Sequence, residues 1–207
     1  MALFSDVVFM PGSPRCSPLL THWQPVALSG VYLADPLRTL MSSRDSLTAR
    51  LSRLVDAPIT VRLHTQGAGQ GRRDELAALN LPARRRVWRR EVTLEAEGEV
   101  LVAARSVMAL EGCPPWMARL GTQALGHQLF ARAARAPQKA VVQRSGIEIT
   151  RAVPGFLALP MAWGRRSLFT LGVGRAPLLV QEYFVHERFT ECQRPSRSEG
   201  STQRHFG

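Results

Sequence analysis

The sequence contains one lysine, Lys139, among 27 basic residues, so nearly all of its positive charge comes from arginine. The formal net charge of +11 would suit a nucleic-acid partner. Such one-sided use of arginine is more simply explained by codon bias than by chemistry, so charge alone indicates no function. No predicted helix carries a basic stripe and no aromatic cluster accompanies the arginine runs. We therefore expect no nucleic-acid partner.

Cysteine is scarce, and long apolar runs are missing. Cys16, Cys113 and Cys192 are far apart, odd in number and include no CxxC pair, which argues against a disulfide framework or a structural zinc site and favours a reducing compartment. No segment approaches the roughly 18 apolar residues of a membrane span, so we expect no membrane insertion. Residues 1–10 contain Asp6 and no basic leader, which is not typical of a signal peptide. These features predict a cytoplasmic protein.

The length of 207 residues fits one ordinary domain, and 45% apolar residues exclude global disorder. Residues 1–34 are rich in proline, serine and glycine and are predicted to be a poorly ordered extension. Residues 188–207 are polar and are predicted to be a disordered tail. The folded domain is therefore expected at 35–187, and we expect it to be a monomer.

Helices are indicated at three places inside this domain. Residues 47–55 show helical spacing of apolar side chains after the N-cap pair Asp45-Ser46. Residues 74–79 predict a short helix, and residues 114–130 predict two helices separated by a break. The glycine-rich stretch Gly67–Gly71 is expected to form a flexible loop.

Strand-like runs fill most of the remaining domain. The runs 87–96 and 100–108, joined by Glu97-Gly98-Glu99, predict a β-hairpin. The other strand-like runs are 59–64, 147–149, 166–173 and 178–185, of which the last two predict a second hairpin. About six strands in hairpin pairs, with helices inserted, predict an α+β fold with an antiparallel sheet.

One charged residue falls on the apolar face of the first hairpin. Side chains alternate across a strand, and the even positions Trp88, Arg90, Val92 and Leu94 form the apolar row. An unpaired buried ion costs several kcal/mol, so Arg90 needs a partner. A second charge of this kind is Glu182, whose neighbours in the even row are Val180 and Phe184.

Two interpretations of these charges remain open. Arg90 and Glu182 could pair with each other, or with water at the sheet edge. Alternatively, they line a cavity between the sheet and the helices, where the Arg90 guanidinium would bind a ligand carboxylate in bidentate geometry. Glu182 would then accept a hydrogen bond from a ligand hydroxyl, or would accept a proton.

The sequence around these residues resembles the chorismate pyruvate-lyase family. The resemblance covers roughly residues 35–186 and consists of five blocks in the family's order. The blocks are Asp45-Ser46-Leu47-Thr48, then Val87-Trp88-Arg89-Arg90-Glu91 running to Ala104-Arg105-Ser106-Val107, then Leu120-Gly121 with Leu125–Phe130, then Trp163–Ser167, and finally Pro177–Phe184.

The resemblance implies a six-stranded antiparallel sheet with a buried ligand site under helical flaps. It also implies that Arg90, Leu125 and Glu182 bind the substrate, and Leu47 is expected to be a wall of the site. The implied reaction removes pyruvate from chorismate and leaves 4-hydroxybenzoate for ubiquinone biosynthesis. Because aromatisation drives this reaction, no cofactor and no metal are implied.

Several assignments remain open at this stage. The second carboxylate of chorismate needs a donor, for which Arg165, Arg166 or a backbone N–H are candidates. Glu182 could position the substrate hydroxyl or act as a general base, and we favour positioning. His127 is expected at the surface. The alternative function is a non-catalytic module that binds aromatic carboxylates, as in effector-sensing domains, and the sequence does not distinguish the 4-hydroxy product from its isomers.

Overall fold

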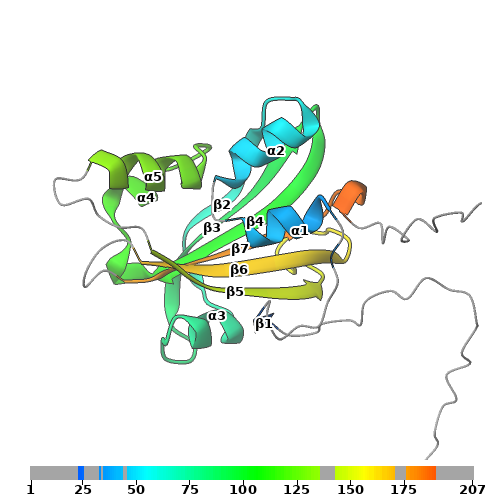
Figure 1. Ribbon diagram of the computed structural model, residues 1–207. Helices are drawn as coiled ribbons and strands as arrows, with labels where there is room; N and C mark the ends of the chain where they lie inside the picture. The colour runs from blue at the N-terminus through cyan, green and yellow to red at the C-terminus, as the bar shows by residue number, and fades with distance from the viewer. Residues whose placement is uncertain are drawn as a thin grey trace, which may run out of the picture.

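The computed structural model describes residues 23–25, 33, 35–43, 46–135, 143–170 and 176–189. They form one antiparallel sheet of seven strands in the order β1-β5-β6-β7-β4-β3-β2 (Figure 1). The strands are β1 (Gln24–Pro25), β2 (Thr60–Gln70), β3 (Arg86–Ala96), β4 (Glu99–Ala109), β5 (Gln143–Ala152), β6 (Ala162–Thr170) and β7 (Leu178–Phe184). The predicted α+β fold is confirmed. The additional strand, β1, has two residues and lies within the predicted extension, most of which is outside the described residues.

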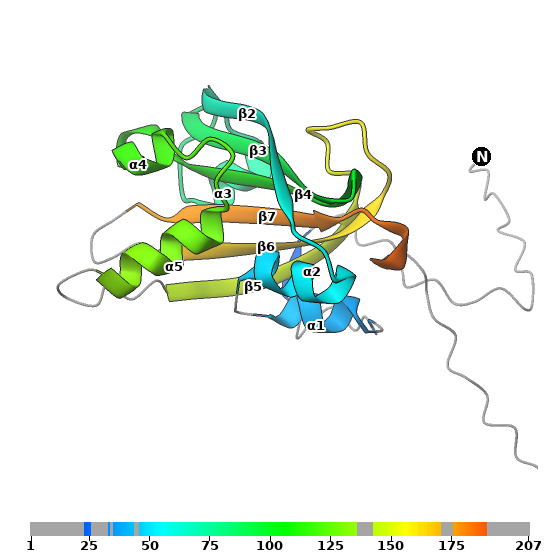
Figure 2. The same cartoon turned by 90° about the horizontal axis from the view of Figure 1, so that it is seen from above.

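The helices are divided between the two faces of this sheet. They are α1 (Leu37–Ser42), α2 (Leu47–Val55), α3 (Arg73–Ala78), α4 (Pro115–Ala118) and α5 (Leu125–Arg135), with single 3₁₀ turns at Leu110–Gly112 and Glu187–Phe189. Figures 1 and 2 show α1, α2 and α5 on one face, called here the front face, and α3 on the opposite, back face. No helix in the described part of the chain is long and apolar enough to span a membrane.

The first predicted hairpin is confirmed as β3 and β4. Glu97 and Gly98 connect the strands with φ angles of 51° and 86°, and Ala96 pairs with Glu99. Two central residues with positive φ define a type I′ turn, whose twist matches that of the flanking strands. The second predicted hairpin is β6 with β7, which pair antiparallel; residues 171–175 at its turn lie outside the described residues.

The helix predictions are largely confirmed. The Ser46 hydroxyl caps α2 by accepting a hydrogen bond from the Ala49 N–H at 3.4 Å, whereas Asp45 is outside the described residues. Leu47 and Leu51 of α2 are buried against the sheet. The short helix α1 was not predicted, because its six residues are too few to show a helical period.

The prediction of a flexible loop at Gly67–Gly71 is wrong over most of its length. Gly67 to Gln70 continue β2 and pair with residues 86–89 of β3. The Arg89 side chain lies directly over Gly69, where an added Cβ would come within 2.4 Å of its Nε. Glycine here allows a close approach within a paired strand, and the pairing with the long β3 determines the conformation.

Candidate active site

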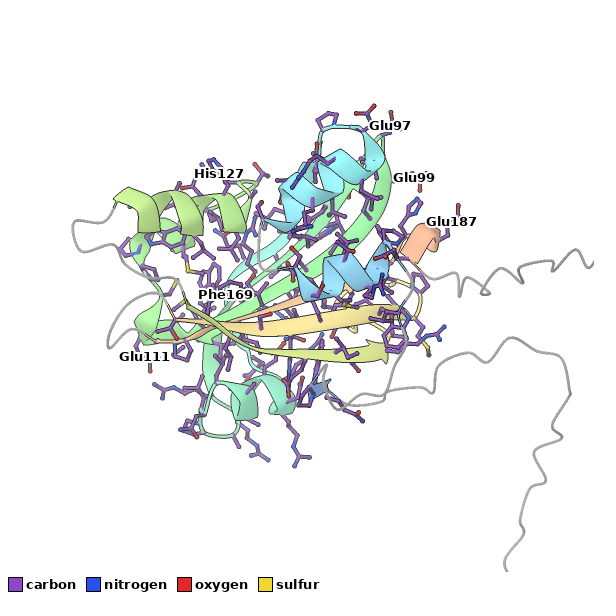
Figure 3. All side chains as sticks on the ribbon, in the orientation of Figure 1. Glu97, Glu99, Glu111, His127, Phe169 and Glu187 are labelled. Carbon is purple, nitrogen blue, oxygen red and sulfur yellow. The ribbon has the colours of Figure 1, made fainter. Side chains whose placement is uncertain are left out.

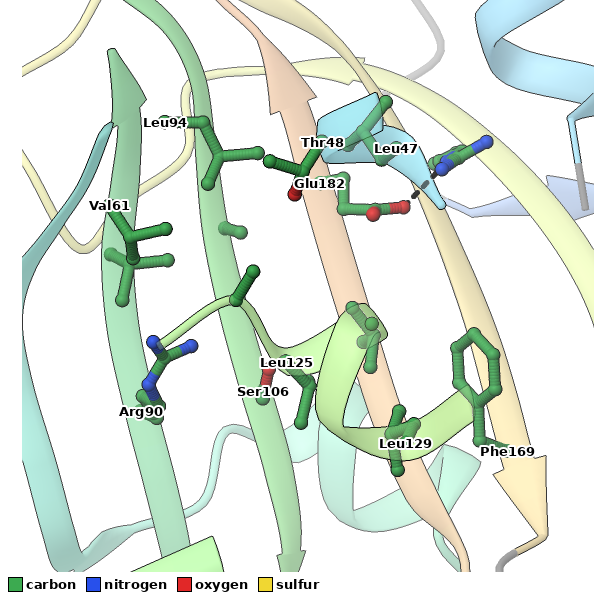
Figure 4. Close-up of a pocket in the computed structure, with 16 residues that line it drawn as sticks. Leu47, Thr48, Val61, Arg90, Leu94, Ser106, Leu125, Leu129, Phe169 and Glu182 are labelled. Carbon is green, nitrogen blue, oxygen red and sulfur yellow. Dashed lines mark hydrogen bonds and ion pairs between the residues drawn. The ribbon is translucent and has the colours of Figure 1, made fainter. Parts of the chain in front are cut away.

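A pocket lies between the front face of the sheet and the helices that cover it (Figure 4). Its floor and apolar walls come from the strands. The strand residues that line it are Val61 of β2; Arg90, Val92 and Leu94 of β3; Ala104 and Ser106 of β4; Arg165 and Phe169 of β6; and Val180 and Glu182 of β7. Arg90 and Glu182 therefore share one cavity, as the second interpretation of the sequence requires.

The strand register arranges the polar groups in two rows across the floor. Arg90 of β3 is opposite Ser106 of β4, which is opposite Val180 of β7. Two residues along β4 on the same face, Ala104 is opposite Glu182, which is in turn opposite Arg165 of β6. Because two residues of a strand span about 7 Å, a guanidinium occupies one end of the floor and an Arg–Glu pair occupies the other.

Arg90 is the cation at the first end, and its side chain is almost completely buried. The residue is 2% exposed, and burial lowers its pKa to about 10. Nε and Nη2 donate to the Gly121 carbonyl at 3.2 and 2.9 Å, and Nη2 also donates to the Gln123 carbonyl at 2.8 Å. Within the described residues no carboxylate contacts Arg90, and its Nη1 donates no hydrogen bond. This end of the pocket therefore holds a buried positive charge without a counter-ion.

Glu182 at the second end is paired with Arg165. Arg165 Nε donates to Glu182 Oε2 at 2.5 Å, and Arg165 is 1% exposed. Arg165 Nη1 also donates to the carbonyl oxygens of Leu40 and Ser43, at the end of α1. Arg165 therefore joins the sheet to α1 and fixes the Glu182 carboxylate at the pocket wall.

The cover of the pocket comes from α2 and from the segment that leads into α5. Leu47 and Thr48 of α2 and Ala124, Leu125, Gly126 and Leu129 at the start of α5 face the cavity. Gln66 of β2 holds this segment from below, accepting from the Gly121 N–H at 3.1 Å and donating to the Ala118 carbonyl at 2.7 Å. The cavity has a volume of about 80 Å³.

The structure places the predicted site residues as follows. Arg90, Leu125, Glu182 and the wall residue Leu47 all line the pocket, and their binding roles stay predictions. The two charges do not pair with each other, since Glu182 pairs with Arg165. Of the two candidates for a second donor, Arg165 lines the pocket, whereas Arg166 is directed to the back face and pairs with Glu148 and Asp74. His127 is exposed on the outer side of α5 (Figure 3).

Three polar residues of the site were not found from the sequence. Ser106 and Thr48 line the pocket, and Gln66 holds its cover. Ser106 stands in the same even row of β4 as Ala104, so the alternation that singled out Arg90 could also have found it. Gln66 gave no such signal, because it lies next to the glycines that were interpreted as a loop.

The back face of the sheet is not exposed to solvent where α3 covers it; it carries a buried network of polar side chains. Arg105 of β4 donates to both carboxylate oxygens of Glu75 of α3, at 2.6 and 2.9 Å, and also to Glu91. Glu75 in addition accepts from the Gln181 amide at 2.7 Å and from the Arg72 N–H at 2.9 Å. All the hydrogen-bonding capacity of this carboxylate is thus used inside the protein, and the network fixes α3 to β4 and β7.

The Glu75 network predicts that the protein becomes less stable in acid. Burial acts to raise the pKa of Glu75, but the hydrogen bonds and charge of Arg105 outweigh it, so the pKa lies below its usual value of 4.5. A depressed folded-state pKa means that the ionised group stabilises the fold above the unfolded pKa, and that this stability is lost as pH falls below it. The free energy of unfolding in urea, measured from neutral pH to about pH 3, is expected to fall below about pH 4.5.

Replacing Glu75 by glutamine is the matching control for this pH effect. The variant lacks the titrating carboxyl, so its free energy of unfolding is expected to be lower at neutral pH and to decline less steeply in acid. An equally steep decline in wild type and Glu75→Gln would contradict the assignment of the pH dependence to this residue.

The charged and apolar groups of the pocket are separated along its floor. A buried cation with a free donor lies at one end, an ion pair lies at the other, and apolar strand residues lie between them. Among the described residues no three His, Cys, Asp or Glu side chains come together as metal ligands.

Comparison with known proteins identifies the family of this chain. The family model for chorismate lyase matches residues 21–193. A protein named "Probable chorismate pyruvate-lyase" from Chromohalobacter salexigens is 41% identical over 89% of this chain and 100% of its own length. A protein of the same name from Halorhodospira halophila is 36% identical over 82% of this chain and 92% of its own length. The chain belongs to the chorismate lyase family and is a lyase.

Solved structures with a similar fold are more distant. A crystal structure of PhnF from Mycobacterium smegmatis matches with a TM-score of 0.49 and 11% sequence identity, over 72% of this chain and 67% of that chain.

Proposed function

We propose that this lyase binds chorismate in the front-face pocket and releases its enolpyruvyl group as pyruvate, leaving 4-hydroxybenzoate. The observation that carries the proposal is the buried Arg90 guanidinium, which has a free donor and no carboxylate partner among the described residues. A buried charge without a partner is costly, and a substrate carboxylate would supply the missing partner. Delivery of 4-hydroxybenzoate to ubiquinone biosynthesis in the cytoplasm is part of the same proposal.

The two ends of the pocket suit the two ends of this substrate. Arg90 would hold the ring carboxylate through Nη1, the guanidinium nitrogen that the Gly121 and Gln123 carbonyls leave free, in a charge-assisted hydrogen bond. The ring hydroxyl lies on the opposite side of the ring and would meet Glu182. The Arg165 guanidinium, which lines the pocket beside Glu182, is the candidate for the pyruvyl carboxylate.

The reaction requires little from the protein beyond orientation of the substrate. The C3–O bond of the ring breaks, the hydrogen at C4 is lost, and the enolpyruvyl methylene gains a hydrogen to become the methyl group of pyruvate. Aromatisation supplies the driving force, so the pocket has to hold the ring in a reactive conformation and exclude water. The closed cover and apolar walls are suited to both tasks.

Glu182 is proposed to position the ring hydroxyl rather than to remove the C4 hydrogen. Its carboxylate is held at the pocket wall by the hydrogen bond from Arg165 Nε to Oε2, which suits a fixed acceptor for the ring hydroxyl. Transfer of the hydrogen within the substrate, from C4 to the enolpyruvyl methylene, requires no protein base.

Replacing Glu182 by glutamine separates the two roles. Glutamine keeps an oxygen that can accept a hydrogen bond from the ring hydroxyl but cannot take a proton at neutral pH, so kcat is expected to stay within about tenfold of the wild-type value. Glu182→Leu, which removes the acceptor, is expected to lose more. The measurement is steady-state kinetics with chorismate. A loss of kcat in Glu182→Gln by about 10³-fold or more would indicate a general base.

The proposed function is tested by incubating the purified chain with chorismate. Chromatography should show chorismate replaced by equal amounts of pyruvate and 4-hydroxybenzoate. An isomeric hydroxybenzoate would contradict the proposed placement of the hydroxyl at Glu182. Binding of 4-hydroxybenzoate without consumption of chorismate would contradict the activity and favour a non-catalytic module that binds aromatic carboxylates.

A further inference from the structure

Ser106 is a buried polar residue of the pocket whose hydroxyl has no hydrogen-bond partner among the described residues. It is 3% exposed, and it lines the cavity from the middle of β4. In the described part of the chain its hydroxyl makes no hydrogen bond. Buried hydroxyls are usually hydrogen-bonded. Among the described residues, the Ser106 hydroxyl therefore resembles Arg90 Nη1 in being a donor at the pocket that is available to a ligand.

The position of Ser106 relative to Arg90 follows from the strand register. The two residues are directly opposite each other on β3 and β4 and face the same side of the sheet. Opposite residues of an antiparallel pair have Cβ atoms about 4.5–5.5 Å apart. Figure 4 shows both side chains at the same end of the pocket, with Glu182 at the other end. One carboxylate can therefore reach both the Arg90 guanidinium and the Ser106 hydroxyl.

We propose that the Ser106 hydroxyl donates a hydrogen bond to the ring carboxylate that Arg90 binds. Ser106 is then a substrate-binding residue that sets the orientation of the ring. A guanidinium alone allows the ring to swing about the carboxylate, whereas a second donor on the neighbouring strand fixes the carboxylate plane. The opposite side of the ring is then directed along the strands toward the row of Ala104 and Glu182, about 7 Å away. This inference rests on the proposed function, because it takes an aromatic carboxylate as the ligand.

The test compares two ligands that differ in the carboxylate. Dissociation constants are measured by calorimetry for 4-hydroxybenzoate and for 4-hydroxybenzyl alcohol, which keeps the ring hydroxyl and lacks the charge. Ser106→Ala is expected to weaken binding of the acid by about tenfold to a hundredfold, because the lost hydrogen bond is to a charged group. Binding of the alcohol should change by less than about threefold. Ser106→Thr, which retains the hydroxyl, should restore most of the affinity for the acid.

Ser167→Ala is the matched control. Ser167 of β6 is opposite Val180 in the same row and is also buried, but it does not line the pocket. Its replacement should leave the ratio of the two affinities unchanged. A Ser106→Ala variant that loses the same affinity for both ligands, or for neither, would overturn the proposal, since a merely structural serine would not distinguish them.

Steady-state kinetics separates failure of this inference from failure of the proposed function. If the wild-type chain converts chorismate, Ser106→Ala should raise KM with kcat nearly unchanged, because the contact is made in both ground and transition states. An unchanged KM would overturn the role of Ser106 and leave the lyase activity in place. A wild-type chain that does not convert chorismate refutes the proposed function, while the two affinities still decide whether Ser106 contacts a carboxylate.

Discussion

Replacing Arg90 by alanine is expected to lower kcat/KM for chorismate by about 10²- to 10³-fold, which corresponds to about 3–4 kcal/mol. The guanidinium is buried, and no carboxylate of the described residues neutralises it. The substrate carboxylate is therefore expected to neutralise the charge of Arg90 when it binds. The variant loses this interaction and also the hydrogen bonds to Gly121 and Gln123 that hold the cover. Both losses are expected to lower kcat/KM.

Arg89→Ala is the matched control for Arg90. The two residues are adjacent on β3, but the Arg89 side chain is directed to the back face, is 34% exposed and lies over Gly69. Its replacement removes the same charge and should change kcat/KM by less than about threefold, because Arg89 contacts Glu91 and Gly69 and does not line the pocket. The kcat/KM of Arg90→Lys should lie between those of Arg89→Ala and Arg90→Ala, since lysine keeps the charge but lacks the planar guanidinium group. Equal activities of Arg89→Ala and Arg90→Ala would contradict the assignment of Arg90 to substrate binding.

Replacing Glu75 by alanine is expected to lower the free energy of unfolding by about 3–5 kcal/mol. Glu75 is 0% exposed and accepts two hydrogen bonds from Arg105. Its removal leaves a buried guanidinium with Glu91 as its remaining carboxylate. The Gln181 amide loses its acceptor as well. The measurement is urea unfolding at neutral pH, followed by tryptophan fluorescence.

Asp74→Ala is the matched control on the same helix. Asp74 pairs with Arg166 at 3.4 Å, but its side chain is 44% exposed, and exposed ion pairs contribute at most about 1 kcal/mol. If Glu75→Ala fails to fold, Glu75→Gln is measured instead, and its free energy of unfolding is expected to be lower than that of the wild type by about 1–3 kcal/mol. Similar stabilities of the Asp74 and Glu75 variants would contradict the structural role of the back-face network.

The elements that could be predicted from the sequence are those with strong local signals. The hairpin of β3 and β4 has alternating side chains and a glycine at its turn, and its structure agrees with both signals. Arg90 was found by the same alternation, because a charge in the middle of an apolar row is conspicuous. Glu182 was found in this way too, although the opposite row of β7 is mixed.

The features that escaped prediction depend on contacts between distant segments. The polar residues Glu91 and Thr93, in the odd row of β3, are buried on the back face. In a sequence, a buried polar row and a solvated polar row look alike. The partner of Glu182 could not be predicted, because Arg165 and Arg166 are adjacent and only the strand register determines which one faces the pocket. The continuation of β2 through Gly67 and Gly69 likewise depends on its pairing with β3.

A crystal structure of the chain with 4-hydroxybenzoate tests the proposed binding mode. We expect the ring to lie under α2 and α5, with its carboxylate within hydrogen-bond distance of Arg90 and Ser106 and its hydroxyl at Glu182. A ligand bound instead in the back-face cavity lined by Trp23 and Tyr183, or bound in the front-face pocket with its carboxylate turned away from Arg90, would contradict it.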